Sequence, residues 1–412
     1  MRVGIGGGVD AGQAGYADPS RTVAVVWQTD AATFASKLRI AGSAEAVAKA
    51  EPALGFSYLL PRESSVSGGP EDGVRFHEAY ACGLEPGRTY YYQVGGGPVG
   101  VEVWSDVRSY TTAPAKGGTD PVIIGFAGDS RDDLGRSDLP VWKAIGGRVK
   151  TAGAHVMTFS GDFVLIGTNQ DMWETWNKAA DGFGSEVFVA MAPGNHENEQ
   201  LRYFANSVMP GKVGKNAERY ASFDYGPVHI VMLDDFDGII YEGGDSTGYK
   251  PELVAWLEAD LAAADANRVA VPFIMTFHHH PLFTSGTKTE RVTERAKVRT
   301  AVQSMFDAHH VDLDIAGHDH FYERSKPIVG DAESPKGTRY IVCAAGGAPS
   351  YDTATTPLSE KIVHYEPDKR EGIYGLVTAD KKSLAVKVYK MNGATGTSPA
   401  DDAVVDELTI TR

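Results

Sequence analysis

Five short apolar runs in this chain end in residues whose side chains bind metal ions, and this recurrence constrains the fold more than any other feature of the sequence. The runs cover 122–127, 155–160, 187–193, 272–277 and 311–316, and they end in Gly128-Asp129, Gly161-Asp162, Gly194-Asn195-His196, His278-His279-His280 and Gly317-His318-Asp319-His320. In an α/β sheet, ligands bind at the carboxyl ends of the strands. A glycine before the polar residue also lets the backbone turn sharply toward a ligand. We therefore expect five strands to bring these side chains to one edge.

The chemistry of these endings indicates the kind of metal. They offer carboxylate, amide and imidazole groups and no thiolate, which suits hard to borderline divalent or trivalent cations. The ligands are too many for one tetrahedral ion. Two ions that share a bridging carboxylate account for the number better.

The order of the motifs resembles that of a known family. GD, GD, GNH, HxP and GHxH follow one another as in the calcineurin-like metallophosphoesterases. The segment 317–324, Gly-His-Asp-His-Phe-Tyr-Glu-Arg, resembles the purple acid phosphatase branch. The resemblance implies an α/β domain of two packed mixed β-sheets flanked by helices. It also implies hydrolysis of phosphate monoesters by attack of a metal-bound hydroxide on phosphorus, with two metal ions (Fe, Zn or Mn) as cofactors.

Residue by residue, the resemblance implies a ligand set. Asp129 and His320 would bind the first metal, Asp162 would bridge both metals, and Asn195, His279 and His318 would bind the second. His196 would hydrogen-bond the phosphate or protonate the leaving oxygen. We interpret Glu197, Tyr322 and Arg324 as partners that orient the ligands.

Two positions depart from the family pattern. The wider superfamily often has Asp-x-His in the first motif, but this chain has Asp129-Ser130-Arg131. Purple acid phosphatases supply a coloured tyrosinate ligand where this chain has Leu165. We therefore expect a protein that is not purple and whose first metal site is weaker, more open or filled by a divalent metal. Arg131 either contacts the substrate phosphate, which suits its planar fork, or pairs with Asp132 or Asp133 at the surface.

The histidines on either side of His279 carry a separate expectation. If the segment is extended, the side chains of His278 and His280 point away from that of His279. Two roles are open for these flanking histidines. One of them reaches the phosphate, and His280 is then the catalytic candidate, or it forms a structural hydrogen bond. We expect the acidic pair Asp234-Asp235, at the end of another apolar run, to be structural.

The chain up to residue 112 has β character. Runs such as 22–29, 37–40 and 89–94 are typical of strands, and the segment 83–92 resembles fibronectin type III-like domains, with Trp27 as a core residue. We predict a β-sandwich over 1–112, a linker rich in Gly and Pro over 113–121, and the catalytic domain over 122–412. Within the last, a helix is expected from Pro251 with an apolar face, and a half-buried strand is expected near 384–388.

Composition narrows the partners and the compartment. The net charge of −15 over 412 residues disfavours nucleic acid and anionic membranes as partners. A small phosphate ester is the expected substrate, and the sequence leaves the oligomeric state open. Cys82 and Cys343 are predicted to be separate buried thiols. No leader is visible, and we expect a secreted or periplasmic protein whose signal peptide has been removed.

Two other functions stay open. A phosphodiesterase could use the same metal core, with the loops 167–181 and 241–250 deciding the preference. A phosphate-binding protein with a degenerate first site is the non-catalytic alternative, favoured by Arg131 and Leu165.

Overall fold

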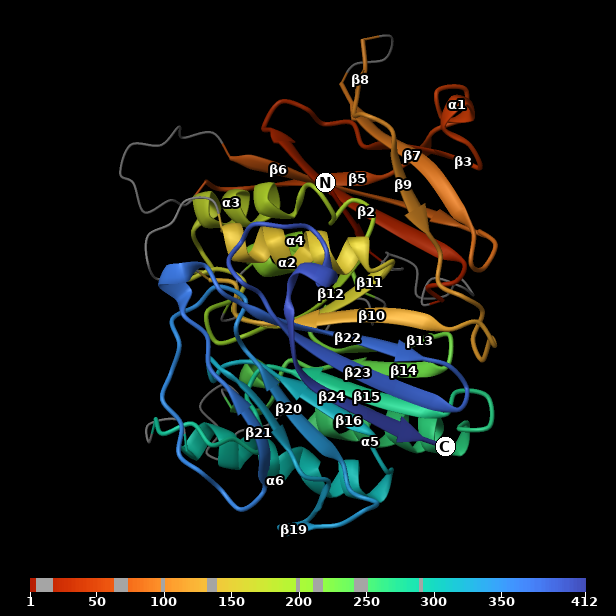
Figure 1. The fold of residues 1–412 in the computed structure, drawn as a ribbon. Helices are drawn as coiled ribbons and strands as arrows, with labels where there is room; N and C mark the ends of the chain where they lie inside the picture. The colour runs from red at the N-terminus through yellow and green to blue at the C-terminus, as the bar shows by residue number, and fades with distance from the viewer. Residues whose placement is uncertain are drawn as a thin grey trace.

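The computed structural model describes residues 1–4, 18–62, 73–97, 101–131, 139–197, 201–209, 218–240, 251–288 and 292–412. Two mixed sheets follow an N-terminal pair of antiparallel sheets (Figure 1). The expected loop 241–250 and the residues Asp132 and Asp133 lie outside the described ranges. None of the described helices combines the length and apolarity that a membrane crossing requires.

The N-terminal region is a β-sandwich. One sheet has the order β1 (Arg2–Gly4), β2 (Thr22–Asp30), β6 (Val74–Cys82) and β5 (Phe56–Leu60). The other has the order β4 (Ala53–Leu54), β3 (Lys37–Ala41), β7 (Thr89–Gly96) and β8 (Val103–Trp104), with β9 (Arg108–Thr111) beside β7 and a short helix, α1 (Ala44–Val47), after β3. Val25 and Ala79 of the first sheet share a core with Leu38 and Tyr92 of the second. Trp27 lies in this core, as predicted, and stacks on a histidine of β6.

The second part of the chain builds two mixed sheets. The six-stranded sheet has the order β12 (Phe188–Ala192), β11 (Val156–Ser160), β10 (Val122–Ala127), β22 (Ile373–Ala379), β23 (Ser383–Lys390) and β24 (Ala403–Thr411). The seven-stranded sheet has the order β13 (Ala221–Tyr225), β14 (Val228–Met232), β15 (Phe273–His278), β16 (Leu313–Ala316), β20 (Arg339–Cys343), β17 (Tyr322–Ser325) and β21 (Ser359–Val363), and a small hairpin joins β18 (Ile328–Val329) to β19 (Ala332–Glu333). Strands β10 to β12 are parallel to one another, as are β14, β15, β16 and β20.

The two mixed sheets pack face to face and helices cover their outer faces. Phe126 and Val377 of one sheet share an apolar core with Met275 and Phe277 of the other. The outer layers are α2 (Pro140–Thr151), α3 (Gln170–Ala180) and α4 (Leu201–Asn206) on the six-stranded sheet, and α5 (Pro251–Ala266) and α6 (Val292–Ala308) on the seven-stranded sheet (Figure 1). The predicted fold class is therefore confirmed.

Local sequence signals explain several of these elements. Helix α5 begins at Pro251 and buries Leu253, Leu257 and Leu261, while Trp256 is only partly buried. In α3, the side chain of Asn169 caps the helix by accepting two backbone N–H bonds. Strand β23 alternates as expected, with Leu384 among its buried residues.

The five apolar runs form the strands β10, β11, β12, β15 and β16. They do not share one sheet, because β10, β11 and β12 lie in the six-stranded sheet and β15 and β16 in the other. The expectation of a single edge was therefore wrong. Apolar runs of this length predict buried strands, but they do not say which of two packed sheets a strand joins.

Neither cysteine forms a disulfide, as predicted, but only one is buried. Cys343 lies in the core, whereas Cys82 is exposed at the end of β6. The prediction was wrong for Cys82 because the last residues of that strand extend beyond the part of the sandwich that buries its start.

Candidate metal centre

The predicted ligand residues come together where the carboxyl ends of strands from both sheets meet. Asp129, Asp162 and Asn195 follow β10, β11 and β12, and His279 and His318 follow β15 and β16. His320 lies two residues further along the chain. The structure thus gathers all six side chains that the sequence singled out, although they span about 190 residues.

Four of these side chains surround what we call the second-metal position. The Nε2 atom of His279 lies 3.0 Å from Asn195 Oδ1, 3.1 Å from His318 Nδ1 and 3.3 Å from Asp162 Oδ1. Asn195 Oδ1 also lies 3.0 Å from His318 Nδ1. Oxygen and nitrogen lone pairs therefore converge on one small volume.

The tautomer of His279 makes this convergence informative. Its Nδ1–H donates to the Ser160 carbonyl at 2.7 Å, so that Nε2 carries a lone pair in the neutral ring. Two imidazoles, a carboxylate and an amide would place lone pairs against one another at these distances, so either a metal ion or a proton on His318 Nδ1 must lie between them. The donor set is the mixed oxygen and nitrogen set that zinc, iron and manganese accept. The residues present therefore fit a metal ion at the second-metal position.

The remaining two ligand residues define the first-metal position, together with Asp162. His320 Nε2 lies 3.3 Å from Asp129 Oδ1, and its Nδ1–H donates to the Pro349 carbonyl at 2.6 Å. Arg131 is only 4% exposed, so it is not a surface residue. Its Nε donates to Asp162 Oδ2 at 3.1 Å, which places a guanidinium among the first-metal ligands.

Asp129 and Asp162 differ in pKa because different charged groups surround them. Burial, reinforced by the nearby Asp162 carboxylate, raises the pKa of Asp129 to about 7. For Asp162, burial would also raise the pKa, but His279, His196 and Arg131 outweigh it and hold the pKa below its ordinary value. Asp162 is therefore the more firmly ionised carboxylate, as its predicted place between two cations requires.

Three ligand residues have an unusual backbone. Asp129, Asp162 and His318 have φ angles of 58°, 57° and 69°, in the left-handed region that costs energy for residues with a Cβ. Neighbouring glycines explain the tight packing, because a Cβ on Gly194 would lie 2.4 Å from Asp162 Oδ1 and one on Gly317 would lie 2.5 Å from Asp129 Oδ2. The predicted role of glycine in letting the backbone approach the site agrees with these contacts.

Glu197 fixes the two loops that carry Asp162 and Asn195. Its buried carboxylate accepts the backbone N–H groups of Asp162, Phe163 and Gly194, each at 2.9 Å, and that of Val164 at 3.4 Å. It thus orients ligands through their backbone.

His196 lies at the rim of the centre, with its side chain 24% exposed. Its Nδ1–H donates to the Leu165 carbonyl at 2.6 Å, and its Nε2 lies 3.7 Å from Asp162 Oδ2. The ring therefore turns one nitrogen toward the centre, within reach of a bound ligand. Leu165 meets His196 through its backbone at the position where the family has tyrosine.

His278 and His280 are fully buried on either side of Asp235. His278 lies between Asp235 and Asp314 at 2.9 and 3.0 Å. Burial opposes protonation of His278, but the two carboxylates raise its pKa to about 10. His280 Nδ1 lies 3.0 Å from Asp235 Oδ1, and its ring packs 4.2 Å from that of His318. The other ring nitrogen, His280 Nε2, is buried without a hydrogen-bond partner among the described residues and lies close to His279 and His318, so the catalytic role expected of His280 stays a prediction.

Tyr322 and Arg324 do not contact the ligands, contrary to our interpretation. Both donate to Asp406 of β24, Tyr322 through its hydroxyl at 2.7 Å and Arg324 through Nε at 2.7 Å. They bind the last strand to β17. Their adjacency to the GHxH motif misled the prediction, because nearness in sequence does not fix which distant residue, here Asp406, a strand side chain meets.

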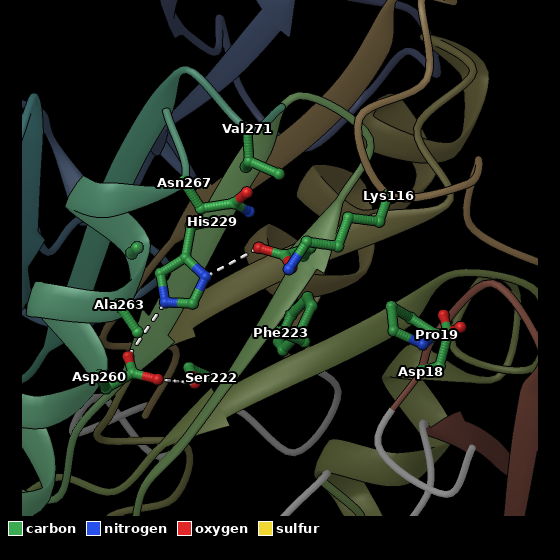
Figure 2. Close-up of a pocket in the computed structure, with 12 residues that line it drawn as sticks. Asp18, Pro19, Lys116, Ser222, Phe223, His229, Asp260, Ala263, Asn267 and Val271 are labelled. Carbon is green, nitrogen blue, oxygen red and sulfur yellow. Dashed lines mark hydrogen bonds and ion pairs between the residues drawn. The ribbon is translucent and has the colours of Figure 1, made fainter. Parts of the chain in front are cut away.

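A pocket of about 630 Å³ lies away from the centre (Figure 2). In it, His229 Nδ1 contacts Asp224 at 2.8 Å and His229 Nε2 contacts Asp260 at 3.0 Å. Ser222 donates to Asp260, and Lys116 pairs with Asp224. Burial opposes protonation of His229, but the two carboxylates raise its pKa to about 9. These polar groups already satisfy one another, so the pocket offers no reactive group of its own.

Comparisons with known proteins point to one family. A family model described as the purple acid phosphatase N-terminal domain matches residues 11–112, and one described as calcineurin-like phosphoesterase matches residues 136–322. Purple acid phosphatase 21 of Arabidopsis thaliana is 29% identical over 301 residues, which are 69% of this chain and 62% of that protein. Acid phosphatase type 7 of Homo sapiens is 33% identical over 209 residues, which are 45% of this chain and 47% of that protein.

A solved structure shows the same fold over the full chain. The purple acid phosphatase PPD1 from yellow lupin seeds superposes with a TM-score of 0.76 at 18% identity, covering 100% of this chain and 74% of that one. The chain spans less than two thirds of the length of the curated relatives described above.

Proposed function

Because the chain belongs to the calcineurin-like phosphoesterases, in their purple acid phosphatase-like branch, we propose that it hydrolyses phosphate monoesters in a metal-dependent reaction. The observation that carries this proposal is the second-metal position, where His279, Asn195 and His318 converge with Asp162. A metal ion bound there supplies Lewis acidity toward a phosphate oxygen and an acidified water. Iron, zinc and manganese all suit these ligands.

The chain's own residues then position the substrate and move a proton. His196 holds Nδ1 against the Leu165 carbonyl and presents Nε2 to the centre, which suits protonation of the leaving oxygen. Arg131 supplies a fixed positive charge beside the centre, where a phosphate dianion would be bound. His280 and Asp235 keep the ring of His318 in place.

The remaining assignments are proposals on the same basis. We propose a small phosphate ester as substrate, a secreted or periplasmic location, and a division into a sandwich over 1–112, a linker over 113–121 and a catalytic domain over 122–412. The strands β9 and β10 on either side of that linker and the two family matches support the division.

A comparison of nitrophenyl phosphate with bis(nitrophenyl) phosphate tests the function. We expect the metal-loaded protein to hydrolyse the monoester faster, to lose turnover after chelation, and to regain it with added divalent metal. His279→Ala should abolish turnover, whereas His309→Ala, far from the centre, should not. Faster diester hydrolysis would favour the phosphodiesterase alternative. Phosphate binding without turnover in the metal-loaded protein would favour a binding protein.

A further inference from the structure

At the first-metal position, the guanidinium of Arg131 contacts the ligand residues. Arg131 Nε donates to Asp162 Oδ2 at 3.1 Å, and Arg131 Nη2 lies 3.3 Å from His320 Nε2. The His320 nitrogen carries a lone pair, because its other nitrogen donates to the Pro349 carbonyl. The guanidinium therefore engages the same two lone pairs that a first metal ion would need.

The backbone around Arg131 holds the side chain in this position. Its own N–H donates to the carbonyl of Asp162 at 3.1 Å. The preceding Ser130 accepts the indole N–H of Trp176 at 3.0 Å and donates to the Phe163 carbonyl at 3.1 Å. Arg131 Nη2 also donates to the hydroxyl of Tyr351 at 3.2 Å. The guanidinium is thus fixed from several sides and is not a side chain that happens to fold inward.

Charge and ligand count agree with this placement. The chain lacks both the histidine of Asp-x-His and the tyrosine of the purple acid phosphatases, so a first ion would have few protein ligands. A guanidinium also carries a permanent positive charge, which repels a second cation close by. At the second-metal position, by contrast, the printed contacts of His279 Nε2 are to atoms of Asn195, His318 and Asp162, all of which can bind a metal ion.

We propose that the guanidinium of Arg131 takes the first-metal position and that this chain binds one metal ion, at the second-metal position, in place of the two that the family implies. The inference rests on the metal centre of the proposed function. Arg131 then supplies, as a fixed cation with N–H donors, the positive charge that a first ion would bring next to a bound phosphate.

Metal stoichiometry tests this inference without relying on turnover. The full-length protein is stripped by chelator, titrated with Mn²⁺ in a calorimeter, and assayed by elemental analysis after gel filtration. Electron paramagnetic resonance distinguishes an isolated Mn²⁺ ion from an exchange-coupled pair. We expect one isolated ion in the wild type and two coupled ions in Arg131→His, which restores the Asp-x-His pattern.

Matched variants separate the role of Arg131 from general effects. Arg131→Lys keeps a cation and should retain one ion. Leu165→Tyr supplies the family's missing ligand but leaves Arg131 in place, and it should also retain one ion. Arg299→Ala, which removes a partly exposed arginine paired with Asp331, is the control for loss of an arginine elsewhere.

The possible results lead to different conclusions. Two tightly held ions in the wild type would overturn this inference and leave the proposed function intact. A natively folded Arg131→His that still binds one ion would show that Arg131 is not the obstacle. A wild type that binds no ion would overturn both the inference and the proposed function. If Arg131→His fails to fold, the wild-type stoichiometry decides alone.

Discussion

Replacing Glu197 with glutamine should destabilise the fold through the loops of the metal centre while leaving the shape of the side chain unchanged. One carboxylate oxygen accepts N–H bonds from Asp162 and Gly194, and the other accepts them from Phe163 and Val164. Glutamine has one oxygen and one NH₂ group. The NH₂ group would therefore face two backbone donors that then have no acceptor.

The magnitude follows from which pair of contacts is lost. The pair at Phe163 and Val164 contains the longest bond, 3.4 Å against 2.9 Å for the others, so the NH₂ group should turn toward it. Burial and the nearby Asp162 carboxylate raise the pKa of Glu197 well above its ordinary value, so the loss is counted from the two backbone donors and not from a charge. A buried donor left without an acceptor costs about 1–3 kcal/mol. We expect Glu197→Gln to lower the free energy of unfolding by about 3 kcal/mol, which a domain of ordinary stability survives.

Urea unfolding of the metal-free protein, followed by tryptophan fluorescence, measures this loss. Glu407→Gln is the control, because Glu407 is an exposed partner of Lys387 and its replacement should change stability by less than about 0.5 kcal/mol. Glu197→Gln should also bind metal more weakly, since Asp162 and Asn195 lose their fixed loops. A change within error of the control would refute the proposed role of Glu197.

Three further predictions follow. The pKa of His229 is raised from 6.5 to about 9, so protonated His229 should contribute about 3 kcal/mol to the free energy of unfolding below pH 6.5, and this contribution should be lost as the pH rises through 9. In urea titrations at several pH values, His229→Gln should weaken this pH dependence. Arg148→Met should cost about 3–5 kcal/mol by leaving the buried carboxylate of Asp402, its partner at 2.5 Å, with no cation and only the Tyr374 hydroxyl as a side-chain donor, and adding Asp402→Leu should recover part of that loss in thermal unfolding. His196→Ala should lower kcat about 100-fold or more for alkyl phosphates and far less for nitrophenyl phosphate, and equal losses in a steady-state assay would argue against the acid role.

The sequence predicted the strands and the composition of the site because these are local properties. Each apolar run forms a buried strand, and a residue that can bind a metal ion follows each strand, as Asp129 and His318 do. The division of the five strands between two sheets was missed, because pairing of β10 with β22 depends on residues about 250 positions apart. The contacts of Tyr322 with Asp406 were missed for the same reason.

The motif pattern could predict that Arg131 replaces a ligand, but it could not predict where its side chain lies. The departure from Asp-x-His was visible in the sequence, and the structure shows where the guanidinium lies, against Asp162 and His320. Its place is set by contacts with residues 31 and 189 positions away along the chain, which no local sequence signal predicts. The role of Glu197 as an acceptor of backbone N–H groups likewise depends on how two loops meet.

The ligands of the second-metal position come from two different sheets, and this limits which substitutions the core between the sheets can accept. Asp162 and Asn195 stand on one sheet and His279 and His318 on the other, so a slide of one layer past its neighbour would misalign the chelate before it unfolded anything. The apolar side chains between the two sheets, Met275 and Val377 among them, therefore set the distance between the two halves of the ligand set. Substitutions that change side-chain volume at these positions should disturb metal binding before they unfold the protein. We therefore expect these core positions, although distant from the metal, to accept few substitutions.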